Sequence, residues 1–268
     1  MMRADYDVLK REIGSSQDFA DLQGVFIDGG HNGVYIRVPR GLELDDVDFL
    51  ERLPGLKYVE VDGAVRDDSR AFSLPEVEEL TLLTGSQVPF RASASDTLTS
   101  LGIDDRPGVL DLSAYTGLQN LTVWSFARKE LDFLSGAPHL RWLKVEGMGQ
   151  AVNLEGIGKC RSLLEVELLE IHAESLAPLR SVRDLLRLWI IGPAKPQGSS
   201  NLDLGELSGM RSLRELRITN SGAVYSVEPL LGLSDLQDVR LRGTRVLEPS
   251  AEVLQRLSRR ARVVGPDE

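Results

Sequence analysis

The chain has 268 residues, a hydrophobic content of 42%, a charged content of 27% and a net charge of −10, which are ordinary values for a soluble globular protein. No apolar run approaches the ~20 residues that a membrane span requires, and the first residues lack the apolar core of a signal peptide, so we expect a cytoplasmic protein. The single cysteine, Cys160, excludes an intrachain disulfide and a multi-cysteine metal site.

The negative charge is concentrated in the first half of the chain. Residues 1–134 carry 24 acidic and 13 basic side chains, whereas residues 135–268 carry 17 and 18. An acidic surface opposes contact with nucleic acid and with anionic lipid, so neither is an expected partner. The charge either serves solubility alone or matches a protein partner with a basic patch. We expect a monomer by default.

Residues 1–46 are predicted to form an amino-terminal cap. Residues 6–22 are interpreted as a helix. Two apolar stretches, residues 25–27 and 34–38, flank the sequence Asp-Gly-Gly-His-Asn-Gly, which predicts a β-hairpin.

From residue 47 to residue 246, one pattern recurs nine times: an aliphatic residue, two variable residues, an aliphatic, one variable residue and another aliphatic. The first aliphatic residues of the copies are Leu56, Val77, Leu98, Leu118, Leu140, Leu163, Leu185, Leu213 and Leu236. Their spacing of 20 to 28 residues is typical of a stacked solenoid. Within residues 131–146, apolar residues recur every three positions and then alternate, which predicts a 3₁₀-like turn followed by a short strand. Cys160 occupies one of the apolar turn positions and is therefore expected to be buried.

These repeats resemble the leucine-rich repeat family, and their steps are most similar to its short bacterial or protein-phosphatase-regulator subtype. The resemblance implies an α/β solenoid, a curved array with a parallel β-sheet on the concave face and short 3₁₀, irregular or helical segments on the convex face. The family usually carries an Asn three residues after the last strand aliphatic. Here that position holds Ala64, Gly85, Arg106, Phe126, Met148, Ile171, Pro193, Ser221 and Thr244. Without the Asn ladder, we expect looser and more irregular turns after the strands.

The one 28-residue step contains an insertion, residues 192–201, whose Pro, Gly and Ser content predicts a loop directly after the strand that bears Trp189. Insertions in repeat arrays often lie at a binding edge, although a neutral insertion explains the sequence equally well. Residues 247–268 are predicted to form a helical carboxy-terminal cap, in which Ser250 caps a helix ending near Arg260 and residues 261–264 add a last strand.

Residues that alternate with the buried aliphatics are predicted to point onto the concave sheet face. The partner-binding candidates on this face are Tyr58, Glu60, Asp62, Trp124, Trp142, Lys144, Glu165, Glu167, Arg187, Trp189, Arg217, Arg240 and Arg242, with Tyr35 and Arg37 expected from the amino-terminal strand. All three tryptophans of the chain fall in this set, and exposed Trp beside Arg is typical of binding hot spots. Intramolecular loops that cover the tryptophans are the alternative. Acidic residues predominate on the first strands of the face and arginines on the last, which predicts a dipolar surface. The charge is expected to be partly neutralised where Glu165 and Glu167 lie beside Arg187.

Signals for catalysis are poor, because the chain has no phosphate-binding glycine loop, no metal-type His spacing and no nucleophile elbow. No catalytic residue, metal or cofactor is therefore predicted. The sequence favours a non-catalytic protein–protein interaction module that binds a protein partner on the concave face. A small acidic chain suits an inhibitor or immunity protein that covers a basic toxin or enzyme. The alternative is a scaffold, or a regulator of a GTPase or phosphatase that would use an exposed loop arginine such as Arg66, Arg106 or Arg128.

Overall fold

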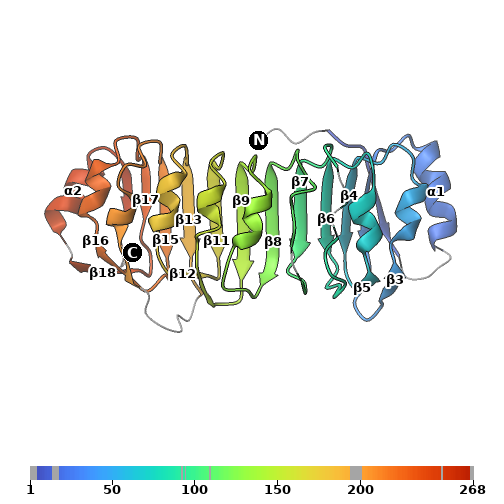
Figure 1. Cartoon of the computed structure of the whole chain (residues 1–268), viewed down its shortest axis with the longest axis horizontal. Helices are drawn as coiled ribbons and strands as arrows, with labels where there is room; N and C mark the ends of the chain where they lie inside the picture. Colours follow the sequence, from blue (N-terminus) through green and yellow to red (C-terminus); the bar gives the residue numbers. More distant parts are fainter. Residues whose placement is uncertain are drawn as a thin grey trace. The chain divides into compact units, whose positions relative to one another are not determined.

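The computed structural model describes residues 5–13, 18–91, 93, 95–108, 110–193, 201–248 and 250–265. The chain divides into two compact units, Met1–Leu121 and Thr122–Glu268. Figure 1 shows the elements of the whole chain, coloured along the sequence. In both units, short strands alternate along the chain with 3₁₀ turns, as the apolar pattern predicts.

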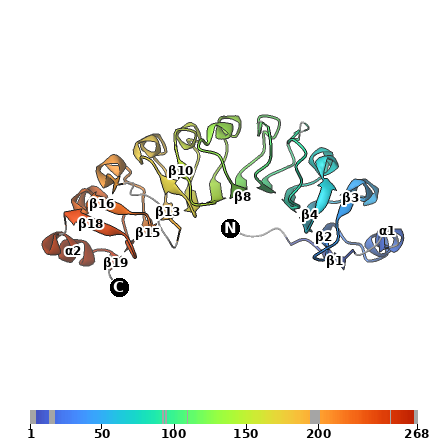
Figure 2. The ribbon, with the colours of Figure 1, turned by 90° about the horizontal axis from the view of Figure 1, so that it is seen from below.

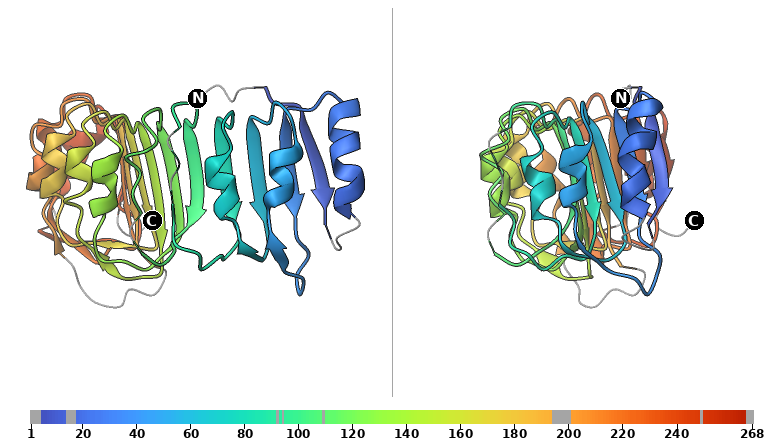
Figure 3. Two further views of the ribbon diagram at one scale, coloured as in Figure 1. Left: turned by 45° about the vertical axis from the view of Figure 1, so that its right-hand side comes forward. Right: turned by 90° about the vertical axis from the view of Figure 1, so that its right-hand side faces the viewer.

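The first unit contains a parallel sheet with the strand order β1-β2-β4-β6-β7. Its strands are β1 (Val8–Glu12), β2 (Gly33–Arg37), β4 (Tyr58–Asp62), β6 (Glu79–Leu83) and β7 (Ser100–Asp104). The helix α1 (Asp18–Asp28) and the 3₁₀ turns η1 (Asp48–Arg52) and η2 (Ser69–Ser73) cover one face of these strands (Figure 3). Two shorter strands, β3 (Leu44–Asp46) and β5 (Val65–Asp67), form a separate parallel pair.

The amino-terminal hairpin predicted from the sequence is wrong. Residues 25–27 belong to α1, and β1 pairs with β2 in parallel, with Val8 opposite Gly33. Leu22 and Phe26, one helical turn apart, are both buried, so the helical period organises this segment. Because parallel neighbours need a crossover rather than a tight turn, α1 supplies the connection that a hairpin could not.

The segment before α1 also differs from the predicted helix over residues 6–22. Val8–Glu12 form the edge strand β1, and α1 begins only at Asp18. Leu9 and Ile13 are buried at a spacing of four residues, which imitates a helical period. The open edge of β2 decides the outcome, because its unpaired backbone groups accept an added strand.

The second unit repeats the same strand-and-turn plan. Its parallel sheet has the order β9-β11-β13-β15-β17-β19, and β8 (Asn120–Phe126) begins at the end of the first unit and continues into the second. The strands are β9 (Trp142–Gly147), β11 (Glu165–Leu169), β13 (Arg187–Ile191), β15 (Glu215–Thr219), β17 (Asp238–Arg240) and β19 (Arg262–Val264). The 3₁₀ turns η3 (Asp132–Gly136), η4 (Ile157–Lys159), η5 (Ala177–Ser181), η6 (Leu204–Leu207) and η7 (Glu228–Gly232) form a layer on one side of the sheet (Figure 2).

Alternation along each strand separates a core face from an open face. In β11, β13 and β15, the second and fourth residues are buried and the others are half-buried. The register aligns the buried positions, so Val166, Leu188 and Leu216 are neighbours and none of them is exposed. This ladder of aliphatic side chains, packed against the 3₁₀ layer, is the core that the repeat predicts.

The turns after the strands do not share one backbone conformation, in line with the irregular turns expected without the Asn ladder. At the first turn position, Gly63 has a φ angle of 118°, whereas Gly147 and Gly192 are not among the residues with positive φ. Ser125, Glu170 and Asn220 occupy equivalent positions and have nearly equal positive φ angles of 53°, 52° and 53°. Short parallel strands then follow in the second unit: β10 (Ala151–Val152) pairs with β12 (His172–Ala173), and β14 (Asn201–Leu202), β16 (Ala223–Ser226) and β18 (Arg245–Glu248) form a sheet.

Other side chains replace the missing Asn amides as partners for the turn carbonyls. The hydroxyl of Thr244 donates to the carbonyl of Ile218 at 2.9 Å, and that of Ser221 donates to Ile190 at 3.2 Å. Gln150 Nε2 donates to the carbonyl of Phe126 at 2.6 Å. Buried backbone acceptors need such partners, and these three side chains supply them in the second unit.

The carboxy-terminal helix is confirmed. It is α2 (Ala251–Ser258), and the Ser250 hydroxyl accepts a hydrogen bond from the backbone N–H of Val253 at 3.2 Å, which is the expected capping contact. Leu257 on this helix is completely buried. The chain then adds β19, which pairs in parallel with β17, so the last strand predicted at residues 261–264 is also present.

Candidate functional site

The open face of the second unit holds the largest group of predicted binding residues. We define the open face as the strand side chains that alternate with the buried aliphatics. In the second unit these include Trp142, Lys144, Glu165, Glu167, Arg187, Trp189, Glu215, Arg217, Asp238 and Arg240, all of them half-buried. The alternation that the sequence predicts for these residues is therefore confirmed, whereas Arg242 lies in the exposed turn after β17.

The register arranges these side chains in two rows. One row runs Lys144, Glu167, Trp189, Arg217 and Arg240 across β9, β11, β13, β15 and β17. Neighbouring strands lie about 4.8 Å apart, so each residue in a row is the lateral neighbour of the next. The second row, one pleat along the strands, runs Trp142, Glu165, Arg187, Glu215 and Asp238.

Opposite charges on this face are paired within the face itself. Arg187 lies between two carboxylates, with Nη1 2.5 Å from Glu165 and Nε 3.1 Å from Glu215. Glu215 also accepts from Arg217 at 2.7 Å, and on the next strand Asp238 accepts from Arg240. The predicted excess of positive charge at the end of the face is therefore largely neutralised, because each arginine on β13, β15 and β17 has an acidic partner.

Trp189 lies at the centre of this network. The guanidinium carbon of Arg217 is 3.9 Å from the centroid of its ring system, and that of Arg187 is 5.3 Å away. These distances correspond to cation–π stacking. Trp189 Nε1 and Arg217 Nε are both buried and have no hydrogen-bond partner among the described residues. Two buried donors on neighbouring strands therefore lack an acceptor, which is uncommon in folded proteins.

Glu167 lies between Lys144 and Trp189 in the same row. Burial raises the pKa of its carboxyl group, while the nearby Lys144 and Arg187 act in the opposite direction. A carboxylate held in a partly desolvated position responds strongly to a new charged neighbour. Glu167 therefore adds an electrostatically sensitive group beside the Trp189 stack.

The other two tryptophans lie on separate strands. Trp142 belongs to the second row on β9, and Trp124 lies on β8. Both are half-buried, and no ring pair recorded for the described residues involves a tryptophan. The sequence placed all three on strands correctly, but only Trp189 stands between two arginines.

In the first unit, the predicted residues Tyr58, Glu60 and Asp62 alternate on β4 as expected. The register sets Tyr35 of β2 beside Glu60, and its hydroxyl donates to Asp62 at 3.4 Å. The hydroxyl of Tyr58 donates to Glu60 in a very short contact. These residues form a second polar group, which is separate from the Trp189 network.

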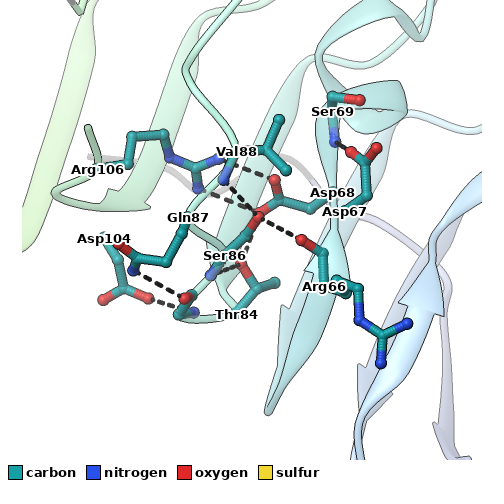
Figure 4. A network of polar contacts seen from close by, with 11 residues as sticks. Arg66, Asp67, Asp68, Ser69, Thr84, Ser86, Gln87, Val88, Asp104 and Arg106 are labelled. Carbon is teal, nitrogen blue, oxygen red and sulfur yellow. Dashed lines mark hydrogen bonds and ion pairs between the residues drawn. The ribbon is translucent and has the colours of Figure 1, made fainter. Parts of the chain in front are cut away.

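The three arginines considered for a regulator have different environments. Arg106 is buried, and its guanidinium makes a bidentate ion pair with Asp68 (Figure 4). It therefore cannot act as an exposed loop arginine, and that expectation is wrong. Arg66 is 66% exposed and pairs with Glu43 and Asp45, while Arg128 is half-buried.

The described residues include no group of three or more His, Cys, Asp and Glu side chains placed to hold a metal ion. Within the same part of the chain, no helix has the length and apolarity needed to cross a membrane. The predicted loop at residues 192–201 falls mostly outside the described residues, because 194–200 are not among them.

Cys160 is buried, as predicted, and its thiol lies 3.3 Å from the carbonyl oxygen of Leu134. Burial raises the pKa of the thiol to about 11, against a lowering influence of Lys159. Because the thiolate is the reactive species, we expect a disulfide reagent at neutral pH to label the native protein more than about 100-fold more slowly than the unfolded protein. Timed labelling with and without guanidinium measures the ratio, and similar rates would contradict the burial.

Comparison with solved structures identifies the class of fold. A leucine-rich repeat protein of Leptospira interrogans aligns over 97% of this chain and 60% of its own length, with a TM-score of 0.60 and 14% identity. The plant peptide hormone receptor RGFR1 in complex with RGF2 aligns over 83% of this chain and 34% of its own, with a TM-score of 0.50 and 12% identity. Internalin C2 of Listeria monocytogenes covers 82% of each chain at 16% identity, with a TM-score of 0.47.

This chain therefore has the leucine-rich repeat fold, an α/β solenoid with parallel strands, as the repeat pattern predicted. It spans 60% of the length of the Leptospira protein and 34% of that of the receptor. No family model matches the sequence, and no curated protein matches it.

Proposed function

We propose that this chain is a non-catalytic interaction module that binds a protein partner through the open face of the second unit. The observation that carries the proposal is the Trp189 network. Trp189 is stacked against Arg187 and Arg217, and two buried donors of this network lack acceptors. Trp and Arg in a tightly packed centre, surrounded by neutralised polar residues, form the composition and layout of a binding hot spot.

The unpaired donors supply a reason for the site to favour a partner. A buried polar group without its hydrogen bond costs about 1–3 kcal/mol. The side chain of Arg217 is 24% exposed, so it has room to reorient when another surface approaches. A carboxylate or carbonyl oxygen of the partner would then accept from the Trp189 indole or the Arg217 guanidinium. Recovering these hydrogen bonds would add to the affinity that the aromatic ring provides.

Within this class we propose an inhibitor or immunity-type role, in which the chain covers a basic protein. The net charge of −10, concentrated in the first half, supports a basic partner through long-range attraction during association, whereas the charges of the open face itself are paired. An inhibitor of this kind would form a stable one-to-one complex that abolishes the activity of its partner. A scaffold would bind without that effect.

We expect the replacement of Trp189 by Ala to weaken partner binding by at least about 2 kcal/mol, or about 30-fold. The physical reason is the loss of the central ring together with both cation–π contacts. The experiment is affinity capture from lysate of the source cells with mass spectrometry, followed by calorimetric titration of the captured partner against wild-type and variant proteins.

Tyr225→Ala is the matched control, because Tyr225 is 48% exposed but lies on β16, outside the open face. The control should bind the partner as tightly as the wild type. A partner that binds the Trp189 variant with unchanged affinity would exclude this face as the binding site.

A further inference from the structure

A second candidate site lies in the first unit. It is a cavity of about 420 Å³, and its aromatic lining consists of three tyrosines: Tyr6, Tyr35 and Tyr58. Tyr35 and Tyr58 come from the neighbouring strands β2 and β4, while Tyr6 precedes β1. The ring centroids of Tyr6 and Tyr58 are 5.4 Å apart. Alternation along the strands predicts that Tyr35 and Tyr58 belong to the open face, but no sequence pattern indicates Tyr6 or the cavity.

The sheet register places two residues of the cavity lining on either side of a glycine. On the open face, Gly33 of β2 stands between Val8 of β1 and Tyr58 of β4. A Cβ atom at Gly33 would approach both Val8 and Tyr58 to 3.1 Å. Because Gly33 has no side chain, Val8 and Tyr58 both lie close over it, and both line the cavity. A larger residue here would crowd the two side chains that border the cavity.

Each tyrosine ring is fixed by a hydrogen bond from its hydroxyl to a carboxylate. Tyr6 donates to Glu78 at 3.2 Å, Tyr35 donates to Asp62 at 3.4 Å, and Tyr58 donates to Glu60. The rings are therefore held in position, and burial together with the acidic neighbours raises the pKa of Tyr6. Rings that are oriented in advance lose little conformational entropy when a ligand binds.

The remaining lining of the cavity is mainly acidic. Asp5, Glu60 and Glu79 line it, against one basic residue, Lys10. The nearby Lys57 is already held by Glu78 at 2.8 Å. Aromatic rings attract a cation through their faces, and carboxylates attract it through charge. The tyrosine rings and the carboxylates therefore both favour a cationic ligand.

We propose that this cavity receives an arginine side chain of a protein partner. The planar guanidinium group stacks on aromatic rings and forms paired hydrogen bonds to carboxylates, and it is less strongly hydrated than an ammonium group. An arginine therefore matches the tyrosines and the acidic groups together, whereas a lysine satisfies mainly the charge. The inference rests on the proposed function, because it specifies the chemistry of a partner that this function requires.

The test is NMR of the full chain with labelled tyrosine rings, titrated with the peptide acetyl-Gly-Arg-Gly-amide. The chain has five tyrosines, of which Tyr115 is buried and Tyr225 lies on β16, so these two serve as internal references. We expect saturable shifts of the Tyr6, Tyr35 and Tyr58 signals with unmoved references. A peptide with uncharged citrulline in place of arginine should produce no shift, and the lysine peptide should bind more weakly.

Glu60→Gln removes a negative charge from the cavity but keeps an acceptor for the Tyr58 hydroxyl. It should lower the affinity for the arginine peptide about fivefold or more. The matched control is Glu228→Gln, an exposed position in η7 of the second unit, which should have no effect. Unmoved Tyr115 signals show that the variants remain folded. The absence of saturable shifts at millimolar peptide, or equal binding of the citrulline peptide, would overturn the proposal.

The two proposals fail independently in these experiments. Trp189→Ala should bind the arginine peptide as the wild type does, because Trp189 is not among the residues that line the cavity. If the peptide binds and no partner depends on Trp189, the cavity assignment stands and the proposed binding face is wrong. If partner binding requires Trp189 and the arginine peptide causes no shift of the tyrosine signals, only the cavity assignment is wrong.

Discussion

Replacing Arg106 by Met should lower the free energy of unfolding of the first unit by about 3–5 kcal/mol. The side chains of Arg106 and Asp68 are 1% and 0% exposed, and two hydrogen bonds of 2.8 and 3.1 Å join them. The Phe72 ring lies 5.1 Å from the guanidinium carbon. A methionine would fill much of the space but would leave the Asp68 charge buried without its partner. Urea unfolding followed by circular dichroism measures the change.

The double variant Asp68→Asn/Arg106→Met separates charge from packing. It removes both charges but keeps a side-chain oxygen that accepts from the Thr84 hydroxyl, as Asp68 does in the wild type. We expect it to recover at least half of the stability lost in Arg106→Met, because an intact buried ion pair adds little net stability compared with a neutral replacement. Similar stabilities for the wild type and Arg106→Met would show that the pair does not hold this region together.

The repeat pattern predicts the strands of the array because its signal is local. Leu163, Val166 and Leu168 specify a turn and a strand within six residues, and the same spacing in every copy implies parallel stacking. The amino-terminal segment lacks such repetition. There, Leu9 and Ile13 have a helical spacing but lie in and beside an edge strand. Pairing with β2, which no local pattern encodes, overrides that spacing.

In the candidate sites, too, the sequence predicts what depends on neighbouring residues and misses contacts between residues far apart in the chain. Alternation along a strand identifies Trp189 and Arg217 as members of the open face. Their stacking depends on the register between β13 and β15, across the longest step of the array. The Tyr6–Glu78 and Arg106–Asp68 contacts join residues 72 and 38 positions apart. The one local sign of the second contact was a long charged side chain, Arg106, at a turn position where several other repeats have small or apolar residues.

Leu188→Ala and Trp189→Ala should have opposite consequences, although the two residues are adjacent. Leu188 is completely buried between Val166 and Leu216, so removing its side chain leaves a cavity in the ladder and should cost about 3–5 kcal/mol of unfolding free energy. Trp189 is half-buried on the other face, and its removal should cost about 1 kcal/mol, mainly through the lost cation–π contacts.

The comparison tests the assignment of the two faces without knowledge of the partner. Urea unfolding of the two variants, beside the wild type, gives both free energies under identical conditions. A one-residue shift in the register of β13 would exchange the two side chains between core and open face, and the order of the two effects would then reverse. With the expected order, a loss of partner binding in Trp189→Ala reflects the missing ring and not an unfolded domain. A larger destabilisation for Trp189→Ala than for Leu188→Ala would place the indole in the core, and the hot-spot interpretation would then be wrong.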